Sequence, residues 1–228
     1  MRVRRHAALV WVAALVGALV GLAACSSDGG SGVNRGGSPS GQSATPSELV
    51  NKAAGPYQGF GIDPPQPRPT FRLTDTAGRP FDFSPATSGR PTLLFFGYTH
   101  CPDACPTTMA DINQALQAVA APVRAKTVVV FVTTDVKRDT GPVITKWLAQ
   151  FSTGLSAGQM IGLHGTQTQI DAAQAAARVS IAEDRGETHS TVVMLYGPDD
   201  YAHVSFALSD NEREQMIHDL PIVAGVGG

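Results

Sequence analysis

Two cysteines stand four positions apart in the segment GYTHCPDACPTT, which spans residues 97–108. A cysteine thiolate is both the nucleophile of disulfide exchange and a preferred ligand of soft metals. In a tight loop or a first helical turn, this spacing can bring Cys101 and Cys105 close enough for a disulfide or a shared metal ion. Dithiols built for fast exchange more often have two intervening residues, so three residues favour coordination without excluding redox chemistry.

The remaining cysteine, Cys25, follows a sequence typical of an export signal. Residues 1–6 are basic, and residues 7–21 form an uncharged apolar run, shorter than the ~20 residues of a membrane-spanning helix. The motif LAAC, residues 22–25, resembles the lipobox of bacterial lipoproteins. We therefore expect a signal peptide over residues 1–24, lipidation of Cys25 and an anchor on the extracytoplasmic face of the cell membrane. Acylation would leave the other two cysteines as an isolated pair.

The composition limits the kind of partner. The 228 residues carry 17 Lys and Arg against 19 Asp and Glu, a formal net charge of -2. This balance gives no general attraction to nucleic acid or to an anionic surface, so binding must depend on a specific site. Residues 25–55 include a glycine- and serine-rich stretch and are expected to form a flexible tether. Residues 56–226 are expected to form one compact domain.

Apolar patterning divides this domain into strands and helices. Short continuous apolar runs predict buried strands, and apolar residues spaced three and four apart predict amphipathic helices. The expected strands are residues 70–74 and 81–83 in an N-terminal hairpin, then 92–97, 126–134, 160–163, 191–196 and 201–206. The expected helices are residues 107–121, 141–151, 166–178 and 210–220, the last capped by Ser209 or Asp210. Residues 55–69 are expected to lie extended against the domain. This order predicts a three-layer α/β domain with a mixed central sheet.

The cysteine segment joins the strand expected at residues 92–97 to the helix expected from residue 107. Ligand sites in open α/β sheets lie beyond the carboxyl ends of the strands. A helix N-terminus also carries roughly +0.5 of an elementary charge, which favours a thiolate over a thiol. We therefore expect both thiols in the loop at the N-terminus of that helix.

Four sequence blocks resemble the SCO/SenC family and occur in the family's order. They are GYTHCPDACPTT, TTDVKRDT at residues 133–140, IGLHGTQTQID at residues 161–171 and ETHSTVVMLYGPDD at residues 187–200. The resemblance extends over residues 57–221. It implies a thioredoxin-like fold and a role in maturing the binuclear copper centre of cytochrome c oxidase.

The resemblance also implies the ligands and the partner. Two thiolates alone make an incomplete site, and Cu(I) is satisfied by a third ligand in a trigonal array. Carried over residue by residue, the copper ligands are Cys101, Cys105 and His189, and the partner is the copper-bearing subunit of the oxidase. The chain departs from the family in having Val136, where a proline usually follows the aspartate that matches Asp135.

The residues themselves leave other interpretations open. Apart from the resemblance, a solvated loop residue is the simpler interpretation of His189, which lies in a polar stretch. His100 is interpreted as a supporting or surface residue beside Cys101. Asp103 and Asp135 could tune the thiol charge or orient the ligand histidine, but solvated loop carboxylates are the simpler interpretation.

Alternative functions also follow from the cysteine pair. Zinc accepts two cysteines and a histidine with an open fourth position, although ligand softness and the resemblance favour copper. The alternative function is a thiol-disulfide oxidoreductase that reduces the cysteines of the copper acceptor. A peroxidase is weaker, because neither cysteine lies in a Pro-x-x-x-Thr-x-x-Cys pattern. An inert structural disulfide would leave His189 without a role.

Overall fold

The computed structural model describes residues 55–180 and 191–225. Its strands form one mixed sheet in the order β1-β8-β7-β4-β5-β6-β2-β3. The strands are β1 Phe60–Pro67, β2 Arg72–Asp75, β3 Pro80–Asp82, β4 Thr92–Gly97, β5 Val128–Thr133, β6 Met160–His164, β7 Val192–Tyr196 and β8 Tyr201–Ala207. Neighbouring strands β4, β5 and β6 are parallel, and the other pairs are antiparallel.

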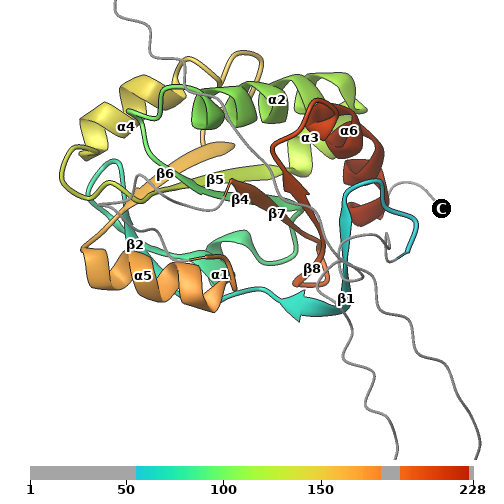
Figure 1. The fold of residues 1–228 in the computed structure, drawn as a ribbon, viewed down its shortest axis with the longest axis horizontal. Coiled ribbons are helices and arrows are strands. Elements are labelled where there is room, and N and C mark those ends of the chain that lie inside the picture. The colour runs from blue at the N-terminus through green and yellow to red at the C-terminus, as the bar shows by residue number, and fades with distance from the viewer. Residues whose placement is uncertain (1–54, 181–190, 226–228) are drawn as a thin grey trace, which may run out of the picture. The chain divides into compact units, whose positions relative to one another are not determined.

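Helices cover both faces of this sheet (Figure 1). The helices are α1 Phe83–Thr87, α2 Ala104–Ala118, α3 Ala121–Lys126, α4 Gly141–Leu148, α5 Gln167–Ala176 and α6 Glu212–Val223. Side chains of β4 alternate between the two layers: Leu93 and Phe95 pack with α2, α4 and α6, whereas Leu94 and Phe96 pack with α1 and α5. Both faces of β4 are thus buried, which explains why its apolar run is continuous. The predicted three-layer α/β fold is confirmed.

The segment expected to lie extended against the domain, residues 55–69, contains a strand. Residues 60–67 form β1, which pairs antiparallel with β8 at one end of the sheet. The chain just before β1 is fixed to α6, because the backbone N–H groups of Gln58 and Gly59 donate to the buried carboxylate of Asp219 at 2.9 and 2.8 Å. The expectation of an extended segment against the domain is thus confirmed. The strand within it was not predicted, because its prolines indicate against a strand.

Several helix bounds differ from the expectation. Helix α2 begins at Ala104, before Pro106, because the first N–H groups of a helix have no intrahelical partner and a proline is tolerated there. The short helices α1 and α3 were not predicted, since neither spans two turns of periodic sequence. Helix α6 is preceded by Asn211 as its N-cap residue, so the predicted capping by Ser209 or Asp210 is wrong.

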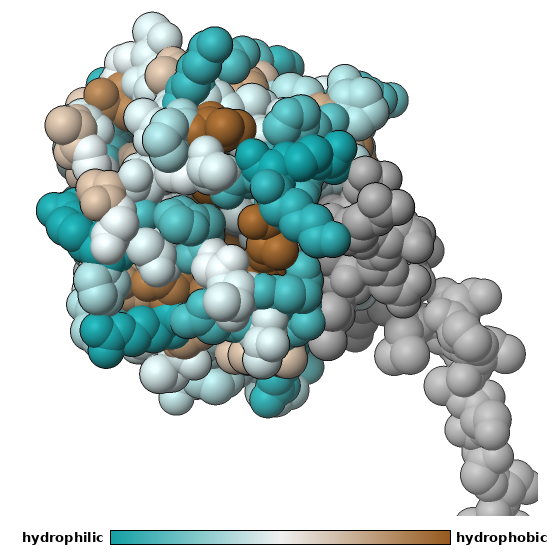
Figure 2. All heavy atoms as spheres, turned by 90° about the vertical axis from the view of Figure 1, so that its left-hand side faces the viewer, coloured by the Kyte–Doolittle hydropathy of each residue, from teal (hydrophilic) through white to brown (hydrophobic). Residues whose placement is uncertain are grey.

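The described surface is mixed in polarity. Figure 2 shows hydrophobic residues on one face as separate patches between hydrophilic ones. Within the described ranges, no helix has both the length and the apolar character needed to cross a membrane.

Candidate metal centre

The two cysteines lie beyond the carboxyl end of β4, at the start of α2. Cys101 is in the connecting loop, where its N–H donates to the carbonyl of Tyr98 at 3.3 Å. Cys105 is in the first turn of α2, so the expectation that both thiols precede the helix is correct only for Cys101. The structure therefore gives the two thiols different backbone environments, one in a loop and one in a helix.

The thiol of Cys101 is arranged to carry a negative charge. Both cysteines are free thiols, and the N–H of Cys105 donates to Sγ of Cys101 at 3.3 Å. Partial burial opposes ionisation of Cys101, but this bond, the backbone N–H of Asp103 and the side chain of Tyr98 together hold its pKa below the usual value. Hydrogen bonds to the charged form favour that form, and the helix N-terminus acts in the same direction.

The thiol of Cys105 has the opposite character. Its side chain is fully buried, and burial is the main cause that raises its pKa well above the usual range. The negative charges of Cys101 and Asp139 raise the pKa of Cys105 further. Sγ of Cys105 also lies so close to β4 that a Cβ atom at Gly97 would be 2.9 Å away, so position 97 requires a glycine. The pair thus combines one accessible, more acidic thiol with one enclosed thiol.

This difference predicts an order of chemical modification. In the reduced protein, iodoacetamide should alkylate Cys101 first, because the thiolate is the reactive form and Cys101 is both more exposed and more acidic. Its alkylation rate should rise with pH and reach half its maximum below the pH of an unperturbed thiol, since a lowered pKa gives more thiolate at each pH. Peptide mass spectrometry after a short reaction measures the order. Equal labelling of Cys105 in the folded protein would contradict it.

His189 and Cys25 lie outside the described residues. The structure resumes just before β7, which pairs antiparallel with β4 so that Val193 lies opposite Phe95. Because the two strands are antiparallel, the beginning of β7 lies beside the carboxyl end of β4, the end that leads to the cysteines. The segment that contains His189 therefore connects to the described structure at the same edge of the sheet as the thiol pair.

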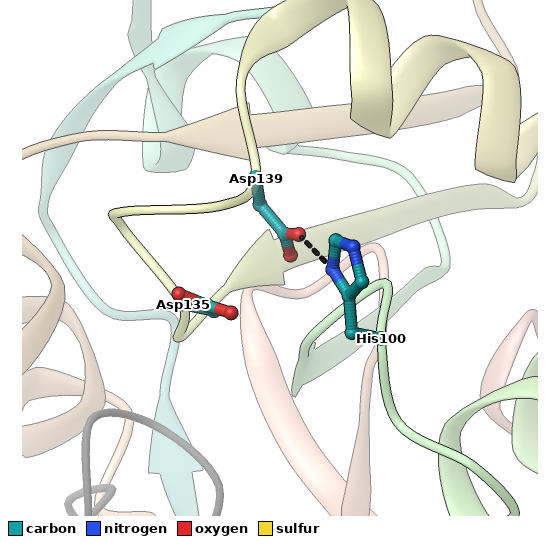
Figure 3. A group of neighbouring side chains, drawn as sticks. All are labelled: His100, Asp135 and Asp139. Carbon is teal, nitrogen blue, oxygen red and sulfur yellow. Dashed lines mark ion pairs between the residues drawn. The ribbon is translucent and has the colours of Figure 1, made fainter.

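A group of three side chains stands beside the cysteine loop (Figure 3). His100, Asp135 and Asp139 place ligand-type atoms within 4.8 Å of one another. The half-exposed imidazole of His100 has Nδ1 3.4 Å from a carboxylate oxygen of Asp139. This position agrees with the interpretation of His100 as a supporting residue next to Cys101.

The two aspartates of this group are buried. Asp135 accepts hydrogen bonds from the backbone N–H and the guanidinium of Arg138, so the expectation of a solvated loop carboxylate is wrong for Asp135. Val136, which replaces the proline usual in the family, packs against the core on the α5 side of the sheet. The backbone N–H of Asp139 donates to the carbonyl of Asp135 at 3.0 Å, which closes the turn between β5 and α4.

Asp103 occupies a different place. It is the exposed N-cap residue of α2, and its side chain makes no capping hydrogen bond. Two other described histidines pair with carboxylates away from the cysteines: His203 with Asp199 at 2.8 Å, and His218 with Asp219 at 2.7 Å. Neither belongs to the cysteine site.

Two residues near the thiols were missed from the sequence. Tyr98 contacts Cys101 through its side chain and Cys105 through its backbone N–H. Asp139 is hydrogen-bonded to the loop that leads to Cys101. The available signal was position: Tyr98 directly follows β4 and Asp139 lies in the turn after β5, and open α/β sheets place their ligand sites beyond the carboxyl ends of such strands.

The donor set fits a soft metal and also fits thiol chemistry. Two free thiols within hydrogen-bonding reach supply the sulfur ligands that Cu(I) and Zn²⁺ accept. Their asymmetry is equally that of a dithiol in which one sulfur attacks and the other resolves. Geometry alone therefore leaves these two uses open.

Comparisons with known proteins bear on the choice between metal binding and thiol-disulfide exchange. The model of the SCO1/SenC family matches residues 62–224. The protein SenC of Rhodobacter capsulatus is 41% identical over 116 residues, which cover 48% of this chain and 49% of SenC. The structure of Bradyrhizobium japonicum ScoI with copper bound is 29% identical, with a TM-score of 0.56, and covers 68% of this chain and 98% of that one. A SCO1/SenC family lipoprotein from Bacillus anthracis, 20% identical with a TM-score of 0.60, shares the fold over 72% of this chain and 99% of its own. The chain spans less than two thirds of the length of the first curated relatives it matches.

Proposed function

The chain belongs to the SCO1/SenC family, and we propose that it binds copper through Cys101, Cys105 and His189 and delivers it to the binuclear copper centre of cytochrome c oxidase. The observation that carries the proposal is the pair of free thiols at the carboxyl end of β4, with Cys101 held toward the thiolate. The copper in the structure of B. japonicum ScoI supports copper over zinc as the metal.

Each cysteine has a distinct part in this proposal. Cys105 is enclosed by the core, so it holds the metal from the protein side. Cys101 is partly exposed, so an incoming ligand of the acceptor can reach the metal next to it. Copper lowers the cost of ionising the buried thiol, because metal binding requires the thiolate and releases a proton. The arrangement suits a protein that must retain its cargo and also release it.

His189 supplies the third ligand in the proposal. It stands three residues before the start of β7, and three extended residues span about 10 Å. The start of β7 lies beside the carboxyl end of β4, from which the cysteine loop departs. A histidine ligand supplied by this segment would therefore approach the thiol pair from the same edge of the sheet.

The proposed location in the cell rests on the N-terminal sequence. A lipid on Cys25 would hold the domain at the extracytoplasmic face of the membrane, where the copper-bearing subunit of the oxidase is its proposed acceptor. Two acyl chains suffice for stable anchoring, because each buried CH₂ contributes about 0.8 kcal/mol. In this proposal, the 30 residues between Cys25 and residue 56 would serve as the tether between the lipid and the domain.

The test is copper binding by the purified, reduced protein. We expect one copper per chain, an absorption band from thiolate bound to Cu(II), and loss of that band in His189→Ala. The same variant should keep Cu(I) bound, because two thiolates hold Cu(I) in near-linear geometry, whereas Cu(II) also needs the harder nitrogen. Optical and EPR titrations measure both. An unchanged Cu(II) spectrum in His189→Ala would assign the third ligand to another group, with His100→Ala as the variant to compare.

A second candidate function is thiol-disulfide exchange. It is favoured by the same asymmetry, an accessible Cys101 with a lowered pKa beside an enclosed Cys105. Cys101 thiolate would attack an acceptor disulfide and form a mixed disulfide, and Cys105 would then resolve it. The acceptor gains two electrons and two protons as two thiols, and this chain loses them as it forms the Cys101–Cys105 disulfide.

A further inference from the structure

The carboxylate of Asp139 joins the ends of two parallel strands. Its side chain is fully buried. One oxygen, Oδ2, accepts the backbone N–H of Thr99 at 2.8 Å and the hydroxyl of Thr133 at 2.6 Å. The other, Oδ1, accepts the hydroxyl of Thr99 at 2.5 Å. Thr133 ends β5, and Thr99 follows β4, so this one side chain fixes the loop after β4 to the end of β5.

The position of this contact matters for the cysteines. Thr99 stands two residues before Cys101, and both its backbone N–H and its hydroxyl donate to Asp139. The neighbouring His100 also faces the same carboxylate (Figure 3). A shift of Asp139 would therefore move the loop that carries Cys101, while Cys105 is held separately by α2.

The hydrogen bonds around Asp139 are those that suit a carboxylate. All three strong partners are donors, and hydroxyl-to-oxygen distances of 2.5 and 2.6 Å are typical of an ionised acceptor. This charge lies beside the thiols, because Asp139 is hydrogen-bonded to Thr99, which stands two residues before Cys101. In a buried site, such a charge acts with little screening.

We propose that Asp139 is a positioning residue of the copper site, which fixes the loop before Cys101 and whose charge favours Cu(II) over Cu(I) between the thiolates. The inference rests on the proposed copper function. With two thiolates, Cu(I) gives the site a net charge of one minus, and Cu(II) gives it none. A fixed negative charge nearby therefore disfavours the extra electron of Cu(I), and Asp139 should bias the oxidation state of the bound metal.

Asp139→Asn tests the charge while it keeps the network. The amide oxygen can take the place of Oδ2 and keep both of its bonds, and the amide N–H₂ can donate to the hydroxyl of Thr99, which rotates to accept. We expect the ratio of the Cu(I) affinity to the Cu(II) affinity to rise about tenfold. Competition titrations with a chelator selective for each oxidation state measure the two affinities. Because the readout is a ratio, loss of folded protein, which lowers both affinities alike, does not mimic the effect.

Three further variants make the test decisive. Asp139→Ser removes the same charge with a smaller side chain and should change the ratio in the same direction. Thr133→Val removes a hydrogen bond but keeps the charge, so it should lower both affinities together. Asp219→Asn is the matched control, because that carboxylate is also buried and also accepts hydrogen bonds from the backbone, from Gln58 and Gly59, but it belongs to α6.

The outcomes separate this inference from the proposed function. If the unmodified protein binds no copper, the proposed function is wrong. If it binds copper and both charge-removing variants keep the original ratio, Asp139 serves the fold alone and the inference is wrong. A change of ratio in Thr133→Val as large as that in Asp139→Asn would also overturn it, because the charge would then not be the cause.

Discussion

Cys105→Ser should lower the Cu(I) affinity of the purified protein by more than the roughly 10–100-fold that is typical when a hydrogen-bond partner of a metal ligand is lost. The hydroxyl of serine is a hard, neutral donor at any pH that the protein tolerates, so it cannot replace a thiolate. The fold should survive, because the backbone N–H of Tyr98 that faces this side chain can bond to the hydroxyl. Burying the more polar group should cost about 1–3 kcal/mol of unfolding free energy.

Copper titration and thermal unfolding of the same samples separate the two effects. Cys101→Ser should lose copper to a similar extent with a smaller cost in stability, since its side chain is partly exposed. Cys25→Ser is the matched control: it removes the third cysteine, which has no part in the proposed site, and should leave the copper affinity unchanged. A Cys105→Ser protein that is folded and still binds copper as tightly would remove the cysteine pair from the metal site.

The central sheet was predictable because the apolar pattern of its central strands is compatible with only one environment, burial on both faces. The apolar runs of β4 and β5 are too short for helices. They also lack the alternation of apolar and polar residues that is typical of a strand with one solvent-exposed face, so both faces had to be buried. Burial on both sides in turn required helices above and below. The thioredoxin-like character came from the family resemblance and not from the patterning.

The parts that were missed depend on contacts between distant segments. Residues 60–67 contain three prolines, which locally indicate against a strand. At the edge of the described sheet, however, β1 pairs only with β8, so a missing N–H can face solvent on the other side. Asp135 was interpreted as solvated, because nothing local shows that the turn after β5 folds inward and buries it. The role of Asp139 could not be predicted from local sequence either. Its partners Thr99 and Thr133 lie after β4 and at the end of β5, far from each other in the sequence.

The position of the candidate site was predictable from the sequence, but the difference between its two thiols was not. The position of Cys101 and Cys105 at the carboxyl end of a strand followed from the order of elements alone. Their asymmetry did not, because it depends on one extra turn of α2, which encloses Cys105, and on the close approach of its thiol to Gly97. His189 stays a prediction, since it lies outside the described residues.

Cells that carry His189→Ala should show the same large loss of oxidase activity as cells that carry Cys101→Ser or Cys105→Ser, if copper delivery is the function. The reason is that the histidine completes the proposed copper site but has no necessary part in thiol-disulfide exchange. Purified His189→Ala protein should therefore still reduce a model disulfide at the rate of the unmodified protein. The measurements are oxidase activity in membranes from cells grown at limiting copper, and disulfide reduction by the purified variants. His203→Ala is a matched control, because that histidine pairs with Asp199 and is not part of the proposed copper site. If the His189→Ala cells assemble normal oxidase while either cysteine variant fails, reduction of the acceptor is the function, and the copper delivery proposed here is wrong.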